Sequence, residues 1–133
     1  MNKEKPFDME LFFASLADKT RLRILNLIGD DEVCVCYLVE IIDTNQPKIS
    51  RHLAYLKKAG LVSVRRDWKW SHYRIVKPNN EGARKVLAET LAWLRNEPEM
   101  QNDKKQMKNL CCIPVAQQPI SIQGAPKPER VAV

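Results

Sequence analysis

The 133-residue sequence lacks a long apolar run, and no stretch approaches the roughly 18 apolar residues that a membrane-spanning helix needs. The first residues, MNKEKPFDMELFF, contain no apolar segment followed by a small-residue cleavage site, so no secretory signal is predicted. These absences predict a cytoplasmic protein without a membrane partner. In that reducing compartment, the four cysteines are expected to bind metals or to react as thiols instead of forming disulfides.

The motifs of common enzymes are also missing. The sequence has no glycine-rich phosphate-binding loop, no Ser/His/Asp or Cys/His pairing with supporting context, and no C-x-x-C spacing. We therefore expect no enzyme activity and no required cofactor. The 44% hydrophobic and 29% charged residues are typical of a folded domain and exclude a collagen-like or wholly disordered chain.

Acidic side chains are nearly absent from the middle of the sequence. Residues 44–77 contain nine lysines and arginines but one acidic residue, Asp67, for a net charge of +8. By contrast, residues 1–43 have a net charge of −4. Such segregation favours a face that meets a polyanion such as nucleic acid. A solvated charged face is the alternative, and charge alone does not decide between them.

Apolar periodicity and capping residues predict five helices, over about residues 8–16, 19–28, 34–42, 46–59 and 80–96. The helix at 46–59 has the clearest pattern, because Asn45 can cap its start, Pro47 suits its first turn and Gly60 ends it. Its apolar positions form one stripe that is expected to be buried: Ile49, Leu53 and Leu56. Two β-like runs follow at 61–66 and 72–76, joined by a linker that fits a flexible hairpin.

This order of elements predicts a mainly α-helical winged helix-turn-helix with a small β-hairpin. In such a fold the helix at 46–59 enters the major groove of DNA, and the hairpin, or wing, follows the phosphates. The candidate DNA-binding residues are therefore polar side chains of that helix and basic side chains of the wing: Gln46, Lys48, Ser50, Arg51, Tyr55, Lys58, Arg65, Arg66 and Lys69.

Four stretches resemble a known family: LADKTRLRILNLI (16–28), EVCVCYLV (32–39), QPKISRHLAYLKKAGLV (46–62) and WKWSHYRI (68–75). Their order and spacing resemble the ArsR/SmtB family of metal-responsive bacterial repressors, and the CVC pair is similar to the arsenic and antimony branch of that family. The resemblance implies a homodimer that binds double-stranded operator DNA. It also implies that a trivalent metalloid, As(III) or Sb(III), releases the protein from that DNA.

The resemblance covers most of residues 10–97, so we assign residues 1–97 to a domain for DNA binding and dimerisation. Residues 98–133 form a C-terminal segment with a cysteine pair. Within it, residues 99–113 are expected to hold a further helical piece. From Pro114 onward, Pro, Gln, Ser, Gly and Ala predominate, so a disordered tail is predicted.

Cys34 and Cys36 are the first candidates for metalloid ligands. On an intact helix their side chains would point about 200° apart, so one ion can join them only if the helix start unwinds or is extended. As(III) and Sb(III) are soft ions that select thiolate ligands. The alternative is a pair of buried cysteines that act as small hydrophobic residues. The family resemblance favours the ligand role.

The sequence departs from the family pattern at Val39, where a third cysteine is common. Cys111 and Cys112 are therefore the candidates for a third sulfur, although they could be an incidental exposed pair or a redox-sensitive site. The zinc-sensing branch of the resembled family uses His and acidic ligands on its last helix. The helix at 80–96 has Glu81 and Glu89 but no histidine, so the resemblance argues against a zinc, cobalt or nickel site there. His52 is expected to be a packed, hydrogen-bonded residue, and His72 a structural residue of the wing.

These observations predict a metalloid-responsive transcriptional repressor that dissociates from operator DNA when As(III) or Sb(III) binds its cysteine thiolates. Three alternatives remain open. The protein could be a repressor that senses redox state through its thiols, or a sensor of organoarsenicals that uses two cysteines. It could also be a structural DNA-binding protein that ignores metals.

Overall fold

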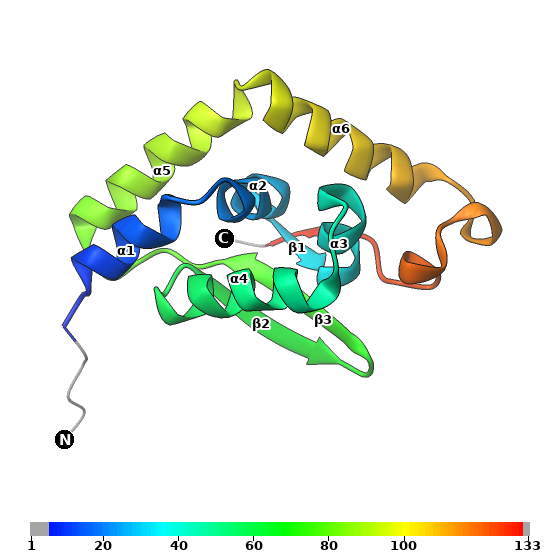
Figure 1. Cartoon of the computed structure of the whole chain (residues 1–133), viewed down its shortest axis with the longest axis horizontal. Helices are drawn as coiled ribbons and strands as arrows, with labels where there is room; N and C mark the ends of the chain where they lie inside the picture. The colour runs from blue at the N-terminus through cyan, green and yellow to red at the C-terminus, as the bar shows by residue number, and fades with distance from the viewer. Residues whose placement is uncertain (1–5, 132–133) are drawn as a thin grey trace.

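The computed structural model describes residues 6–131 (Figure 1). Its helices are α1 (Met9–Leu16), α2 (Lys19–Ile28), α3 (Val35–Ile42), α4 (Gln46–Lys58), α5 (Glu81–Arg95) and α6 (Pro98–Cys112), followed by the short 3-10 helices η1 (Val115–Gln117) and η2 (Ile120–Ile122). The strands β1 (Asp31–Cys34), β2 (Val62–Asp67), β3 (Trp70–Ile75) and β4 (Glu129–Arg130) form one antiparallel sheet in the order β2-β3-β1-β4. None of the described helices is long and apolar enough to cross a membrane.

Helix α4 forms where the sequence predicts it, and it ends one residue earlier. The side chain of Asn45 accepts a hydrogen bond from the backbone N–H of Lys48 at 2.9 Å, which satisfies a free donor of the first turn. Gly60 follows the helix with a φ of +79°, a conformation that glycine adopts without strain. The predicted apolar stripe is confirmed, because all three of its side chains are fully buried.

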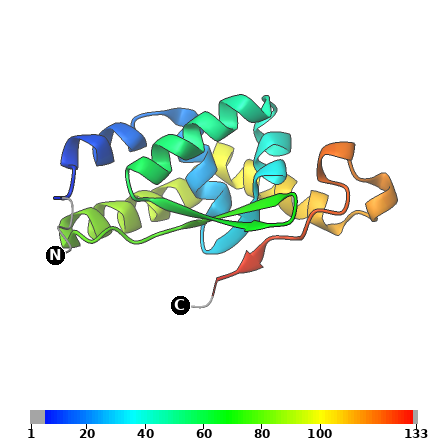
Figure 2. The ribbon, with the colours of Figure 1, turned by 90° about the horizontal axis from the view of Figure 1, so that it is seen from below.

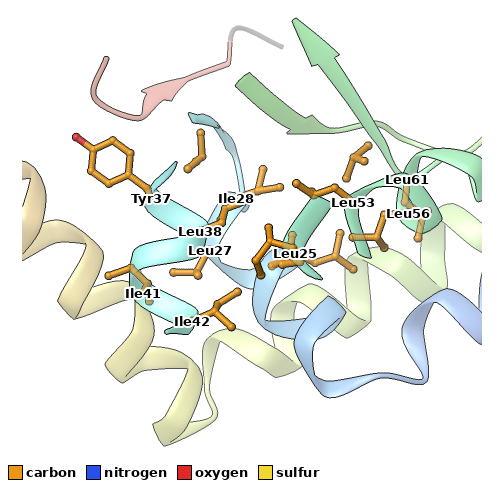
Figure 3. Close-up of a cluster of buried hydrophobic side chains, with 14 of the residues drawn as sticks. Leu25, Leu27, Ile28, Tyr37, Leu38, Ile41, Ile42, Leu53, Leu56 and Leu61 are labelled. Carbon is orange, nitrogen blue, oxygen red and sulfur yellow. The ribbon is translucent and has the colours of Figure 1, made fainter. Parts of the chain in front are cut away.

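The hydrophobic core joins α2, α3 and α4 (Figure 3). Each of these helices contributes large side chains to it: Leu25, Leu27 and Ile28 from α2, Leu38, Ile41 and Ile42 from α3, and Leu53 and Leu56 from α4. Apolar burial of this kind is the main source of folding free energy. The shared core fixes α3 and α4, the two helices of the helix-turn-helix, relative to each other.

Helices α5 and α6 meet at an angle, and both pack against α2 (Figure 1). The guanidinium of Arg23 donates two hydrogen bonds, of 2.8 and 2.9 Å, to the carboxylate of Asp103, which is 3% exposed. The side-chain amide of Asn26 also donates to the carbonyl of Met100 at 3.0 Å. The helical piece expected at 99–113 is therefore a full helix, and it packs on the same body as the helices before it.

The C-terminal residues differ from the expected disordered tail. Within residues 115–131, η2 packs on α3 and β4 pairs with β1, and Ile122 in η2 is fully buried. The hydroxyl of Ser121 donates to the carboxylate of Glu40 at 2.7 Å, and β4 pairs with β1. Composition does not reveal this arrangement, because one buried isoleucine and a two-residue strand leave no periodic pattern.

The sheet corrects two local predictions. Cys34, expected at the start of a helix, instead ends β1, where it pairs with His72 of β3. The expected flexible linker at 67–71 is instead a tight turn, because β2 extends to Asp67 and β3 begins at Trp70. The first error arises because β1 pairs with a strand that is distant in sequence. The second arises because Trp68 is not a residue typical of a tight turn.

Candidate functional site

Helix α4 presents a polar face to solvent. Five of its six candidate DNA-binding residues are exposed: Gln46, Lys48, Ser50, Arg51 and Lys58. Figure 2 shows the β2–β3 hairpin running beside α4, so the helix and the wing can meet one duplex together. In a helix-turn-helix, the N-terminal residues of the second helix contact the base edges. Here those residues include Lys48, Ser50 and Arg51.

Tyr55, the sixth candidate on α4, is half-buried beneath Arg21 of α2. The Arg21 guanidinium lies 4.3 Å from the centre of the Tyr55 ring and 3.2 Å from Nδ1 of His52. It also donates hydrogen bonds of 2.9 Å to the carbonyls of Ala14 and Ser15. Arg21 therefore joins α1, α2 and α4, and the packed, hydrogen-bonded role predicted for His52 is confirmed. Sequence reasoning missed Arg21, because its partners lie in other helices.

The wing contains three candidate phosphate contacts, and their surroundings in the structure differ. Arg66 and Lys69 are exposed. The Lys69 ammonium lies 4.7 Å from the ring centre of Trp68 and 4.9 Å from that of Trp70. Arg65 instead donates two hydrogen bonds to the carboxylate of Glu32 in β1. The sequence could not reveal that pairing, since Glu32 lies outside the basic segment.

The sulfur atoms of Cys34 and Cys36 lie 2.9 Å apart, with the Cys36 thiol donating to Cys34. This approach is possible because Cys34 is extended at the end of β1 whereas Cys36 lies in the first turn of α3. The 200° separation expected on one helix therefore does not apply. Cys34 is buried, 1% exposed, and Cys36 is half-buried. Two soft donors thus converge directly before the helix-turn-helix.

The two thiols share a proton, and this makes one of them acidic. The hydrogen bond from the Cys36 thiol lowers the pKa of Cys34 to about 7, against the opposing effect of burial. Backbone N–H groups of Cys36 and Ser71 lower this pKa further. The same hydrogen bond and burial raise the pKa of Cys36. Because the thiolate is the form that binds metals, Cys34 is prepared as a ligand near neutral pH.

Tyr37 lies near this pair and also near Cys111. Its hydroxyl is buried and has no hydrogen-bond partner within residues 6–131, and Figure 3 shows it pointing away from Leu38 and Leu27. Burial is the main cause that raises the pKa of Tyr37, and the nearby thiols of Cys111, Cys36 and Cys34 raise it further. Tyr37 is a site residue that sequence reasoning missed, because a buried aromatic in α3 reads as core.

The two C-terminal cysteines have different surroundings. Cys111 is half-buried against the core and near Tyr37, and burial raises the pKa of its thiol. Cys112 is exposed. Across the described part of the chain, no three His, Cys, Asp or Glu side chains are grouped closely enough to hold a metal ion. The structure therefore brings together two of the four candidate ligands, Cys34 and Cys36, and places Cys111 near Tyr37.

Comparisons with known proteins agree with this architecture. Residues 18–64 match the family described as bacterial regulatory protein, arsR family. The chain is 39% identical over 109 residues to the arsenical resistance operon repressor of Escherichia coli K12, a match that covers 74% of this chain and 92% of that repressor. It is 47% identical over 66 residues to the arsenic resistance transcriptional regulator ArsR1 of Pseudomonas putida, covering 49% of this chain and 52% of that protein.

A solved structure is also similar. The homodimeric winged helix-turn-helix DNA-binding domain Mb0332 from Mycobacterium bovis is 26% identical with a TM-score of 0.53, covering 73% of this chain and 94% of that domain. The predicted winged helix-turn-helix is thereby confirmed. The matches are to DNA-binding regulators and not to enzymes, as the sequence predicts.

Proposed function

The chain belongs to the arsR family of bacterial regulatory proteins, and we propose that it is a cytoplasmic repressor that releases its operator when As(III) or Sb(III) binds its cysteine thiolates. One observation carries the proposal. The sulfurs of Cys34 and Cys36 lie 2.9 Å apart at the junction of β1 and α3. A pair of thiols that share one proton at this junction is suited to a soft, thiolate-seeking ion.

In this proposal the repressor binds double-stranded DNA as a homodimer. The exposed face of α4 contacts base edges, and Arg66 and Lys69 of the wing contact phosphates. Exposed apolar side chains on α1 and α5 support dimerisation through these helices: Met9 (63% exposed), Phe13 (51%) and Trp93 (68%). A twofold dimer requires a roughly palindromic operator with half-sites about one helical turn apart.

Cys111 is the third ligand that we propose, rather than Cys112. It is half-buried near Tyr37, and the thiols of Cys34 and Cys36 lie close enough to Tyr37 to raise the pKa of its hydroxyl. Cys112, by contrast, is exposed. With arsenous acid, three As–S bonds replace three As–O bonds, and each thiol proton leaves in a molecule of water.

Release follows because Cys111 must move toward the other two sulfurs. That movement draws the C-terminal end of α6 toward the start of α3, and α3 shares its core with α4. The ion shifts the equilibrium only by its preference for the released form. A change from 1:99 to 99:1 requires a preference of about 5.5 kcal/mol, which a third bond available only after movement can provide.

The test is a gel-shift titration of single Cys→Ser variants with arsenite and antimonite. We expect the Cys34, Cys36 and Cys111 variants to bind operator DNA like the wild type and to remain bound when the metalloid is added. Cys112→Ser is the matched control, and it should be released at the wild-type concentration. Normal release of both Cys34→Ser and Cys36→Ser would contradict the proposal.

A second function is favoured by the convergence of two sulfurs. Methylarsenite forms two As–S bonds, so a sensor of organoarsenicals needs only Cys34 and Cys36. In that case methylarsenite releases Cys111→Ser and the wild type equally well, while arsenite releases neither. Diamide provides the remaining comparison, because release by diamide without any response to metalloids identifies a redox sensor.

A further inference from the structure

The tip of the wing carries a large side chain that the fold does not use. Trp68 is 83% exposed and lies outside the hydrophobic core. It is the first residue of the two-residue turn between β2 and β3. Its one described aromatic contact is with the ammonium of its neighbour, Lys69, 4.7 Å from the ring centre.

The backbone of Trp68 is also strained. Its φ is +56°, in the left-handed region where a Cβ atom is unfavourable. Hairpin turns with a positive φ at this position ordinarily contain glycine or asparagine. Trp68 thus combines backbone strain with the exposure of an apolar ring, and neither stabilises the folded protein. Such a combination points to a role in binding.

The surroundings of Trp68 identify the partner. Arg66 and Lys69 are exposed at the tip together with one carboxylate, Asp67, whose charge Arg65 offsets at 4.0 Å, and the exposed Arg74 lies farther along β3. Figures 1 and 2 both place the tip near the N-terminal end of α4, the end that contacts base edges. An apolar ring on a hairpin whose net charge is positive matches a DNA minor groove, whose sugar–phosphate walls are anionic and whose floor presents base edges.

We propose that Trp68 enters the minor groove beside the half-site read by α4 and packs against deoxyribose and base edges there. This inference rests on the proposed DNA-binding role of α4. It adds a contact that depends on the shape of the groove next to the site, because the groove must widen to admit the ring, and deformable base steps widen most easily. The flexible steps expected at that position are pyrimidine–purine steps.

Substitutions at Trp68 test this inference by producing opposite effects on folding and binding. Trp68→Gly removes both the strain and the ring, so its melting temperature should equal or exceed that of the wild type. Its affinity for a duplex selected by the wild type from a random pool should fall by about tenfold, because an aromatic ring that is buried in the complex is lost. Trp68→Asn tolerates the turn and should behave similarly, whereas Trp68→Phe should retain most of the affinity.

Dimethyl sulfate probing then locates the contact, because it methylates guanine N7 in the major groove and adenine N3 in the minor groove. Trp68→Gly should lose protection at adenine N3 beside the half-site and keep protection at guanine N7. Arg51→Ala should show the reverse pattern. Unchanged affinity and N3 protection in Trp68→Gly would overturn this inference alone, whereas unchanged binding by Arg51→Ala would instead contradict the reading role of α4.

Discussion

The carboxylate of Glu32, two residues before Cys34, accepts two hydrogen bonds from the guanidinium of Arg65, at 2.6 and 3.0 Å. Glu32 lies in β1 and Arg65 in β2, and β3 lies between these strands. The ion pair therefore connects the strand that ends in the thiol site to the wing. Arg65 holds the pKa of Glu32 below its usual value, so the carboxylate stays ionised at neutral pH.

We predict that this pair limits the contribution of Arg65 to DNA binding. The plot of log K against log salt has a negative slope. Arg66→Ala should reduce the magnitude of this slope by about one, as expected for a lost phosphate contact. Arg65→Ala should reduce the magnitude by less. Glu32→Gln frees Arg65 for a phosphate and should increase the magnitude of the slope. The double variant Glu32→Gln/Arg65→Ala should lose that increase. Equal slopes for wild type and Glu32→Gln would show that the pair does not restrain Arg65.

Arg51 on the exposed face of α4 is predicted to read a base. Arg51→Ala should weaken operator binding by about 1–3 kcal/mol and leave binding to random DNA little changed. Fluorescence anisotropy with both duplexes measures the difference. Lys105→Ala, an exposed charge change on α6, serves as the control. An equal loss on both duplexes would instead make Arg51 a phosphate contact.

The shared proton of the sulfur pair predicts an unusual titration. In a Cys111→Ser/Cys112→Ser background, thiolate absorbance should show its first step near pH 7, well below the roughly 8.5 of a free thiol. The thiolate is the nucleophile, and its fraction at Cys34 rises as pH increases through that value, so the rate of arsenite binding should fall as pH drops below it. The affinity should not fall with it, because the exchange of thiols for the hydroxyls of arsenous acid releases no net proton. Cys36→Ala removes the donor, and the first step should then move to higher pH because burial remains.

The buried contact between α2 and α6 is predicted to stabilise the fold. Asp103→Ala leaves the Arg23 guanidinium without its partner and should lower the free energy of unfolding by about 2–3 kcal/mol, less than a fully buried pair because Arg23 is partly exposed. Urea denaturation measures the loss. Lys19→Ala breaks the exposed pair with Glu99 on the same two helices and should change stability little.

Local sequence patterns were sufficient to predict much of the DNA-binding half of the molecule. The start and end of α4 depend on Asn45, Pro47 and Gly60, which act within a few residues of their own positions. Its buried stripe follows from helical periodicity alone. These features could be predicted because every cause lies within the segment itself.

The thiol site depended on contacts that the sequence does not display. Strand β1 has four residues, and its partners lie in β3 and in residues 129–130. Without that strand, Cys34 was expected on a helix, and the 2.9 Å approach to Cys36 could not be foreseen. The tight turn at Trp68 could not be predicted either, because tight turns are recognised in a sequence by residues such as glycine and asparagine and not by a bulky aromatic residue.

The pairing of β4 with β1 has a consequence for synthesis of the protein. Chains are made from the N-terminus, and domains begin to fold as they emerge. Until residues 129–130 have been made, β1 has an open edge on the side that β4 later covers. An open edge can pair with another chain and lead to aggregation. The C-terminal strand thus closes the edge beside the thiol site, and a nascent chain stalled before residue 129 leaves that edge open to pairing with another chain.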